Sequence, residues 1–195
     1  MPTSPIESKR ALREHILAQR SPLRADDLSV AAREIRDHAL DTPEIAEATS
    51  VAAYVSTGRE PGTGPLLDAL TERGIDVILP LLLPDDDLDW ARYEGSDRLM
   101  TAARGLLEPD GDPLGPDAIR GVDVVFVPGL AADRRGYRLG RGGGSYDRAL
   151  ERVGPHIWTC VILHDSEVMD IAVPREGHDR AVAATITPSG TRRFR

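Results

Sequence analysis

The residues best suited to chemistry lie in one glycine- and arginine-rich stretch that runs from Pro128 to Asp147. Its glycines would let backbone N–H groups approach phosphate oxygens without interference from side chains. It contains Gly140, Gly142, Gly143, Gly144, Arg134, Arg135, Arg138 and Arg141. This local positive charge in an acidic chain predicts a site for an anionic ligand. A merely flexible loop with solvated arginines is disfavoured, because such flexibility would cost entropy.

The stretch does not match the common nucleotide-binding motifs. No G-x-x-x-x-G-K-[ST] pattern occurs in the chain, so a Walker A loop is excluded. Ser145 also occupies the last glycine position of G-x-G-x-x-G when the pattern is counted from Gly140. The sequence therefore carries no dinucleotide-binding fingerprint.

Lys9 is the only lysine among the 24 basic residues. One interpretation is a compositional bias toward arginine that spared a single position. The other is that position 9 requires a compact ammonium, which a planar guanidinium does not mimic. Arg13 stands four residues further on, so a helix would carry both side chains on one face. Composition leaves both interpretations open.

The elements that must position these residues follow from turn and periodicity signals. Ser4 fits the cap of a first helix, Pro5 its first turn, and Ser21-Pro22 its end. The other expected helices cover residues 26–40, a short segment begun by Thr42-Pro43, residues 65–73 and residues 146–153. The expected strands cover residues 51–56, 75–79, 88–93, 123–127, 157–163 and 182–187, and residues 104–121 are expected to form a long loop.

Strands that alternate with helices predict an α/β fold. We expect residues 1–195 to form a single three-layer domain, with a mostly parallel open sheet and helices on both faces. This Rossmann-like sheet would bind its ligand beyond the carboxyl ends of its strands. The strand at residues 123–127 leads directly into the glycine stretch, and the helix after that stretch would favour negative charge at its start.

Composition excludes several classes of protein. The chain has 195 residues and a net charge of −8, which disfavours a general nucleic-acid binder. It has no long apolar run and a polar start, so we expect neither a membrane span nor a secretory signal. Cys160 is the single cysteine, which excludes an internal disulfide. We expect a cytoplasmic monomer.

From Val127 to Asp147 the chain resembles the signature of 5-formyltetrahydrofolate cyclo-ligases, also called methenyltetrahydrofolate synthetases. The segments Lys9–Arg13, Tyr54–Glu60 and Pro174–Asp179 agree with that family in order and spacing. The resemblance implies conversion of 5-formyltetrahydrofolate to 5,10-methenyltetrahydrofolate, with ATP as co-substrate and Mg²⁺ as cofactor. ADP and phosphate would be released, and the reaction would pass through a phosphorylated formyl intermediate.

The resemblance also implies roles for particular residues. Lys9 and Arg141 would be catalytic, and Asp147 and Asp179 would hold Mg²⁺, although an ordinary surface aspartate is the alternative for each. ATP would be bound by Lys9, Arg10, Ala11, Leu12, Arg13, Arg138, Leu139, Gly140, Arg141, Gly142, Gly143, Gly144, Ser145 and Tyr146. The folate would be bound by Val55, Glu60, Arg141, Gly142, Gly143, Gly144 and Ser145, where a solvated loop acid is the alternative for Glu60.

Two residues depart from the family pattern. Ser145 and Ala132 stand where the family usually carries aromatic side chains, which puts the shape of the folate pocket in question. Trp90 and Tyr93 could wall a pterin ring, but core packing is expected to use them first. The alternative functions are a sugar-phosphate isomerase-like enzyme without ATP, and a non-catalytic relative that binds folate or nucleotide.

Overall fold

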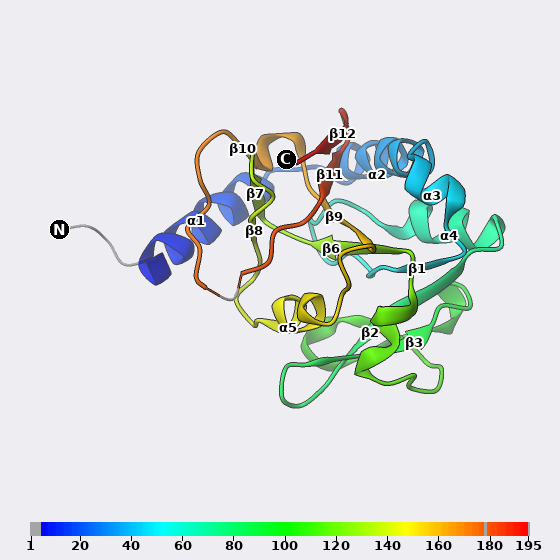
Figure 1. Cartoon of the computed structure of the whole chain (residues 1–195). Coiled ribbons are helices and arrows are strands. Elements are labelled where there is room, and N and C mark those ends of the chain that lie inside the picture. Colours follow the sequence, from blue (N-terminus) through cyan, green and yellow to red (C-terminus); the bar gives the residue numbers. More distant parts are fainter. Residues whose placement is uncertain (1–4, 178, 195) are drawn as a thin grey trace.

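The structure, a computed structural model, describes residues 5–177 and 179–194 (Figure 1). The expected cap at Ser4 lies outside these residues. The first helix, α1 (Pro5–Arg20), ends directly before Ser21-Pro22, as predicted. Among the described residues, no helix is both long and apolar enough to cross a membrane.

A seven-stranded sheet forms the centre, in the order β12-β11-β9-β6-β1-β2-β3. The five inner strands pair in parallel, and the edge strands β3 and β12 run antiparallel to their neighbours. This confirms the predicted mostly parallel sheet. Its strands are β1 (Ser50–Ala52), β2 (Asp76–Leu82), β3 (Leu88–Arg92), β6 (Val124–Pro128), β9 (Trp158–Ile162), β11 (Ala184–Thr187) and β12 (Gly190–Arg193).

Helices cover both faces of the sheet, as the alternation of elements predicted (Figure 1). On one face, Phe126 of β6 packs in a core with α2 (Ala25–Leu40), α3 (Pro43–Glu47) and α4 (Gly64–Glu72). On the other face, its neighbours Val125 and Val127 pack with α5 (Ser145–Glu151) and a 3₁₀ turn at Pro116–Gly121. This alternation along β6 follows from the two-residue period of a strand buried on both sides.

A smaller sheet at one end of the large one was not predicted. It consists of β7 (Ala131–Asp133), β8 (Arg138–Leu139) and β10 (Val168–Met169), in the order β10-β7-β8. Helix α1 packs against it through Ile16, which shares a buried cluster with Leu130 and Leu139. The glycine-rich stretch is therefore partly a β-hairpin rather than one continuous loop.

Several predicted bounds were wrong. The segment expected to be a loop at residues 104–121 contains β5 (Leu107–Pro109), which pairs with β4 (Leu99–Thr101), and the 3₁₀ turn. Strand β1 ends at Ala52 instead of residue 56, and β2 continues through Pro80. The pairing of β1 with β2 reaches only to Ile78, so Pro80 faces a partner strand on one side alone, where a missing N–H is tolerated.

Candidate active site

The main cavity lies beyond the carboxyl ends of β1 and β6, and its volume is about 500 Å³. The chain order of the parallel strands reverses between these two, since β1 leads outward to β2 while β6 leads to β9 and β11. Such a switch point is where ligands bind in open α/β sheets. The walls come from α1, the segment after β1, β2, the β4–β5 hairpin, the glycine loop 140–144 and the segment before Asp179.

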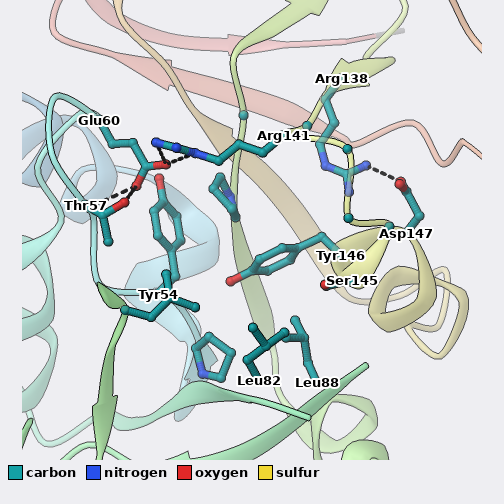
Figure 2. Close-up of a pocket in the computed structure, with 18 of the residues that line it drawn as sticks. Tyr54, Thr57, Glu60, Leu82, Leu88, Arg138, Arg141, Ser145, Tyr146 and Asp147 are labelled. Carbon is teal, nitrogen blue, oxygen red and sulfur yellow. Dashed lines mark hydrogen bonds and ion pairs between the residues drawn. The ribbon is translucent and has the colours of Figure 1, made fainter. Parts of the chain in front are cut away.

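Glu60 is a carboxylate of the cavity with both oxygens held by hydrogen bonds. The segment after β1 folds back so that Glu60 Oε2 accepts hydrogen bonds from Thr57 N at 2.8 Å and Thr57 Oγ1 at 3.2 Å. Its other oxygen, Oε1, accepts from Arg141 Nε at 3.0 Å and lies 2.9 Å from Arg141 Nη2 (Figure 2). The Glu60 side chain is only 8% exposed, whereas that of Arg141 is 57% exposed. Glu60 is therefore a fixed acceptor and Arg141 an accessible cation.

Lys9 and Arg13 project from α1 into the cavity, as their spacing predicted. Lys9 Nζ donates to Asp179 Oδ2 at 2.7 Å and to Glu176 Oε2 at 2.8 Å. Burial would lower the pKa of Lys9, but the hydrogen bonds and charges of Asp179 and Glu176 raise it. Arg13 Nε donates to the carbonyl of Gly140 at 2.8 Å. Lys9 is thus a buried ammonium that stays charged at neutral pH.

The intervening residues of α1 lie outside the lining of the cavity. Arg10 and Ala11 are exposed, and Leu12 packs against the buried cluster of Ile16. Two of the four arginines of the glycine-rich stretch, Arg134 and Arg135, are likewise exposed and outside the lining.

The glycine loop depends on two residues with left-handed backbone. Gly142 has φ 106° and Gly144 has φ 75°, a region that side-chain-bearing residues rarely adopt. A Cβ on Gly142 would also lie 3.3 Å from the Arg13 guanidinium carbon. The remaining predicted loop residues, Leu139, Gly140, Gly143, Ser145 and Tyr146, line the same cavity with Arg138, Arg141 and Val55.

Tyr146 faces the middle of the cavity together with Tyr54 (Figure 2). The two rings meet edge to face, with centroids 6.5 Å apart. Burial and the charge of Glu60 raise the pKa of both hydroxyls, so both remain protonated at neutral pH. The Tyr146 hydroxyl is buried and has no hydrogen-bond partner within the described residues. A buried donor without a partner fits a ligand acceptor.

Asp147 and Asp179 both line the cavity, although they are far apart in the sequence. Asp147 Oδ1 accepts from Arg138 Nη1 at 3.0 Å, and Asp179 Oδ2 accepts from Lys9 and from Glu176 N. The described residues contain no group of three or more histidine, cysteine or carboxylate side chains arranged to hold a metal ion. Carboxylate oxygens are nevertheless a donor type that fits Mg²⁺, which commonly takes one or two protein carboxylates together with other oxygen ligands.

Sequence reasoning missed several lining residues and correctly assigned others to the core. Tyr54, Thr57 and Glu176 line the cavity, and the match of the segments Tyr54–Glu60 and Pro174–Asp179 to the family was the signal that could have indicated them. Trp90 and Tyr93 are buried in the core, as packing predicted. The apolar wall consists of Pro80, Leu82, Leu88, Leu106, Leu107 and Pro128.

The two departures from the family pattern lie in different surroundings. Ala132 is fully buried in β7, whereas Ser145 lines the cavity at the start of α5. Only the change at Ser145 therefore bears on the shape of the pocket.

Comparisons with known proteins agree with the geometry. A family model described as the 5-formyltetrahydrofolate cyclo-ligase family matches residues 5–188. A Mycolicibacterium smegmatis protein named 5-formyltetrahydrofolate cyclo-ligase is 40% identical over 144 residues, which cover 71% of this chain and 73% of that protein. An Escherichia coli protein of the same name is 32% identical over 151 residues, 75% of this chain and 82% of that protein.

Solved structures show the same fold. The NMR structure of Aquifex aeolicus 5,10-methenyltetrahydrofolate synthetase matches with a TM-score of 0.82 and 29% identity, covering 96% of this chain and 93% of that one. A structure of a 5,10-methenyltetrahydrofolate synthetase from Mycoplasma pneumoniae matches with a TM-score of 0.72 and 21% identity, covering 92% and 98% of the two chains.

Proposed function

The chain belongs to the 5-formyltetrahydrofolate cyclo-ligase family, and from that premise we propose that it converts 5-formyltetrahydrofolate to 5,10-methenyltetrahydrofolate with ATP and Mg²⁺. ADP and phosphate are the other products. The formyl oxygen attacks the γ-phosphorus of ATP, and the bond between that phosphorus and ADP breaks. N10 then attacks the formyl carbon and loses its proton, and the carbon–oxygen bond breaks as phosphate leaves.

This reaction requires the protein mainly to position two ligands and to neutralise phosphate charge. The observation that supports this function best is that one cavity contains both a group of cations and a fixed carboxylate. Lys9, Arg138, Arg141 and the glycine loop supply positive charge and backbone N–H donors for the phosphates. The fixed carboxylate of Glu60 supplies an acceptor for the N–H groups of a pterin ring.

Lys9 and Arg141 are proposed as the catalytic cations. Both reach the cavity, and both are held in place by carboxylates while no phosphate is bound. Cations fixed before the reaction stabilise developing phosphate charge without reorganisation. Asp147 and Asp179 would hold Mg²⁺, which neutralises and orients the phosphate oxygens. The roles of Arg10, Ala11 and Leu12 toward ATP would be limited to their backbone, because their side chains lie elsewhere.

The test is an assay of the purified chain with 5-formyltetrahydrofolate, ATP and Mg²⁺. Formation of the methenyl product is followed by its absorbance, and ADP by a coupled enzyme assay. We expect one ADP per methenyl group, and no product when ATP or Mg²⁺ is left out. Product without ATP consumption would contradict the proposal. Ligand binding without turnover would instead support a non-catalytic relative.

A further inference from the structure

We propose that Arg148 is a positioning residue that fixes the glycine loop 140–144 through the carbonyl of Gly143. This inference rests on the proposed function, because it assumes that the loop binds the phosphates of ATP. Arg148 lies on α5, one turn beyond the loop, and it is not part of the cavity lining. Neither the motif nor the family resemblance assigned it a role.

One nitrogen of Arg148 joins two separate segments. Its Nη2 donates to the carbonyl oxygen of Gly143 at 3.1 Å and to that of Asp86 at 2.6 Å. Asp86 belongs to the turn between β2 and β3. The glycine loop is therefore connected to a turn that lies more than fifty positions earlier in the chain.

The turn at Asp86 gives this contact a fixed end. Asp86 N donates to the carbonyl of Leu83 at 3.0 Å, and the Asp86 carboxylate pairs with Arg104 at 2.6 Å. Asp86 has φ 63°, a left-handed conformation that aspartate tolerates better than most residues. The Asp86 carbonyl that accepts from Arg148 therefore belongs to a turn that is fixed by one backbone hydrogen bond and one ion pair.

The glycine loop is closely fitted to the guanidinium. A Cβ on Gly144 would lie 3.0 Å from Arg148 Nη1, which is a tight contact, and the φ of 75° independently favours glycine there. Arg148 Nε is buried and has no hydrogen-bond partner among the described residues. Leaving a buried donor unsatisfied costs free energy. The Arg148 side chain therefore keeps its Nη2 hydrogen bonds to the two carbonyl oxygens, although its Nε is left without an acceptor among the described residues.

Fixing a carbonyl group matters because a phosphate is bound by the N–H group, which lies on the opposite side of the same peptide bond. In a trans peptide the C=O and N–H groups point in opposite directions, so the N–H of Gly144 points away from Arg148. Arg13 Nε also donates to a loop carbonyl, that of Gly140, but from inside the cavity. With the Gly143 oxygen bound by Arg148, which lies outside the cavity lining, the Gly144 N–H is left for an anion.

Arg152, the residue that caps the C-terminal end of the same helix, provides a matched control. Its guanidinium pairs with the Asp87 carboxylate, at 2.9 Å through Nη1 and 2.5 Å through Nη2. It therefore joins α5 to the same turn without contacting the glycine loop. Removing either arginine weakens the attachment of α5, but only removal of Arg148 releases the Gly143 carbonyl.

The experiment compares the wild type with Arg148→Met, Arg148→Lys and Arg152→Met. We expect Arg148→Met to raise KM for ATP about tenfold, because ATP would then bind a loop that has lost a charged hydrogen bond worth roughly that factor. Amide hydrogen exchange in residues 140–144 should accelerate. Arg148→Lys should recover part of the ATP affinity. Arg152→Met should lower the melting temperature while KM for ATP stays near the wild-type value.

An unchanged KM for ATP in Arg148→Met, or an equal rise in Arg152→Met, would overturn the positioning role. If Arg148→Met does not fold, the comparison of Arg148→Lys with Arg152→Met decides in the same way. A wild type without ATP-dependent turnover would refute the proposed function instead. The exchange rates of residues 140–144 would then still decide whether Arg148 fixes the loop: equal rates in wild type and Arg148→Met would refute it.

Discussion

At the scale of single residues, each cation that lines the cavity already has an acceptor within the protein. Lys9 pairs with Asp179 and Glu176, Arg141 with Glu60, and Arg138 with Asp147. Under the proposed function, phosphate oxygens would compete with these carboxylates for the same donors. The internal partners hold the cations charged and oriented before the ligand arrives, which is the condition for electrostatic preorganisation.

Lys9→Ala should raise KM for ATP by roughly ten- to a hundredfold, because a charged hydrogen bond to phosphate contributes roughly 1.5–3 kcal/mol. The variant also removes the ion pair of Lys9 with Asp179, and both of these side chains are only 8% exposed. The melting temperature should therefore fall as well. Steady-state kinetics and thermal unfolding check both effects. Unchanged ATP kinetics would leave the single lysine as an effect of composition, and Lys9→Arg should retain part of the activity.

The same ammonium predicts a pH dependence of stability. Burial lowers the pKa of Lys9, but Asp179 and Glu176 raise it above the unfolded value. A raised pKa stabilises the folded state at pH values below the unfolded pKa of about 10.4, and this contribution is lost as pH rises through the folded pKa. The difference in stability between wild type and Lys9→Met should thus be constant near pH 8 and shrink above about pH 10.4. Denaturant titrations at both pH values measure it, and a constant difference would contradict the ion pairs.

Glu60→Gln tests whether Glu60 binds the folate while its partner Arg141 binds ATP. The substitution keeps one oxygen acceptor but removes the charge that holds Arg141. KM for the folate should rise about tenfold through the lost charged hydrogen bonds, while KM for ATP should stay constant or fall, because Arg141 is released. Kinetics with each substrate varied in turn check this split. A rise in KM for ATP alone would place Glu60 on the nucleotide side.

At the scale of elements, the sequence predicted helices and strands correctly where proline residues or apolar runs gave a strong local signal. Pro5 and Ser21-Pro22 predicted the bounds of α1, and the apolar run around Phe126 predicted β6. The strand β12 was missed because Thr191 to Arg193 are polar residues on a sheet edge and lack apolar alternation. The hairpin of β7 and β8 was missed because its strands have only 3 and 2 residues, and the elements that pack on it, α1 and β10, are distant in sequence.

The candidate site, too, could be predicted only in part from local sequence signals. The glycine loop was recognisable by residue type, whereas Tyr54 and Glu176 lie in segments that match the family but were not singled out as site residues. Their place in the cavity depends on the exit of β1 and on the approach of Glu176 and Asp179 to Lys9 of α1, which only the folded chain defines. Residue type thus indicated the candidate donors, and only the tertiary structure showed which carboxylates pair with them.

The two carboxylates proposed for Mg²⁺ belong to different elements, Asp147 to α5 and Asp179 to the segment after Pro174. If they share one ion, Asp147→Asn and Asp179→Asn should each weaken the Mg²⁺ dependence and the turnover. The double variant should then lose little more than either single one, since groups that act as a unit are not additive. Turnover against Mg²⁺ concentration measures this. Wild-type Mg²⁺ curves in both single variants would refute the assignment and leave the ATP site unaffected.

At the scale of the whole molecule, the site depends on how α1 is attached. The large sheet supplies the segments after β1 and β6, but Lys9 and Arg13 come from a helix outside its two covering layers (Figure 1). Arg20 fixes the end of that helix. Its Nε and Nη2 donate to Glu167 at 2.6 and 2.8 Å, and Nη2 also donates to the carbonyl of Gly129 at 2.8 Å. Gly129 lies in the cavity wall, so this buried pair connects α1 directly to the exit of β6.

Arg20 and Glu167 are only 4% and 2% exposed, so removal of one charge should be far more costly than removal of both. Arg20→Met should destabilise the fold by about 3–5 kcal/mol, because it leaves an unpaired carboxylate in the interior. Glu167→Gln keeps an acceptor for the backbone N–H of His164, which now donates to Glu167 at 2.9 Å. The double variant should therefore be more stable than the sum of the single effects predicts. Denaturant unfolding of all four proteins gives the coupling energy, and strictly additive losses would show that the pair does not attach α1 as a unit.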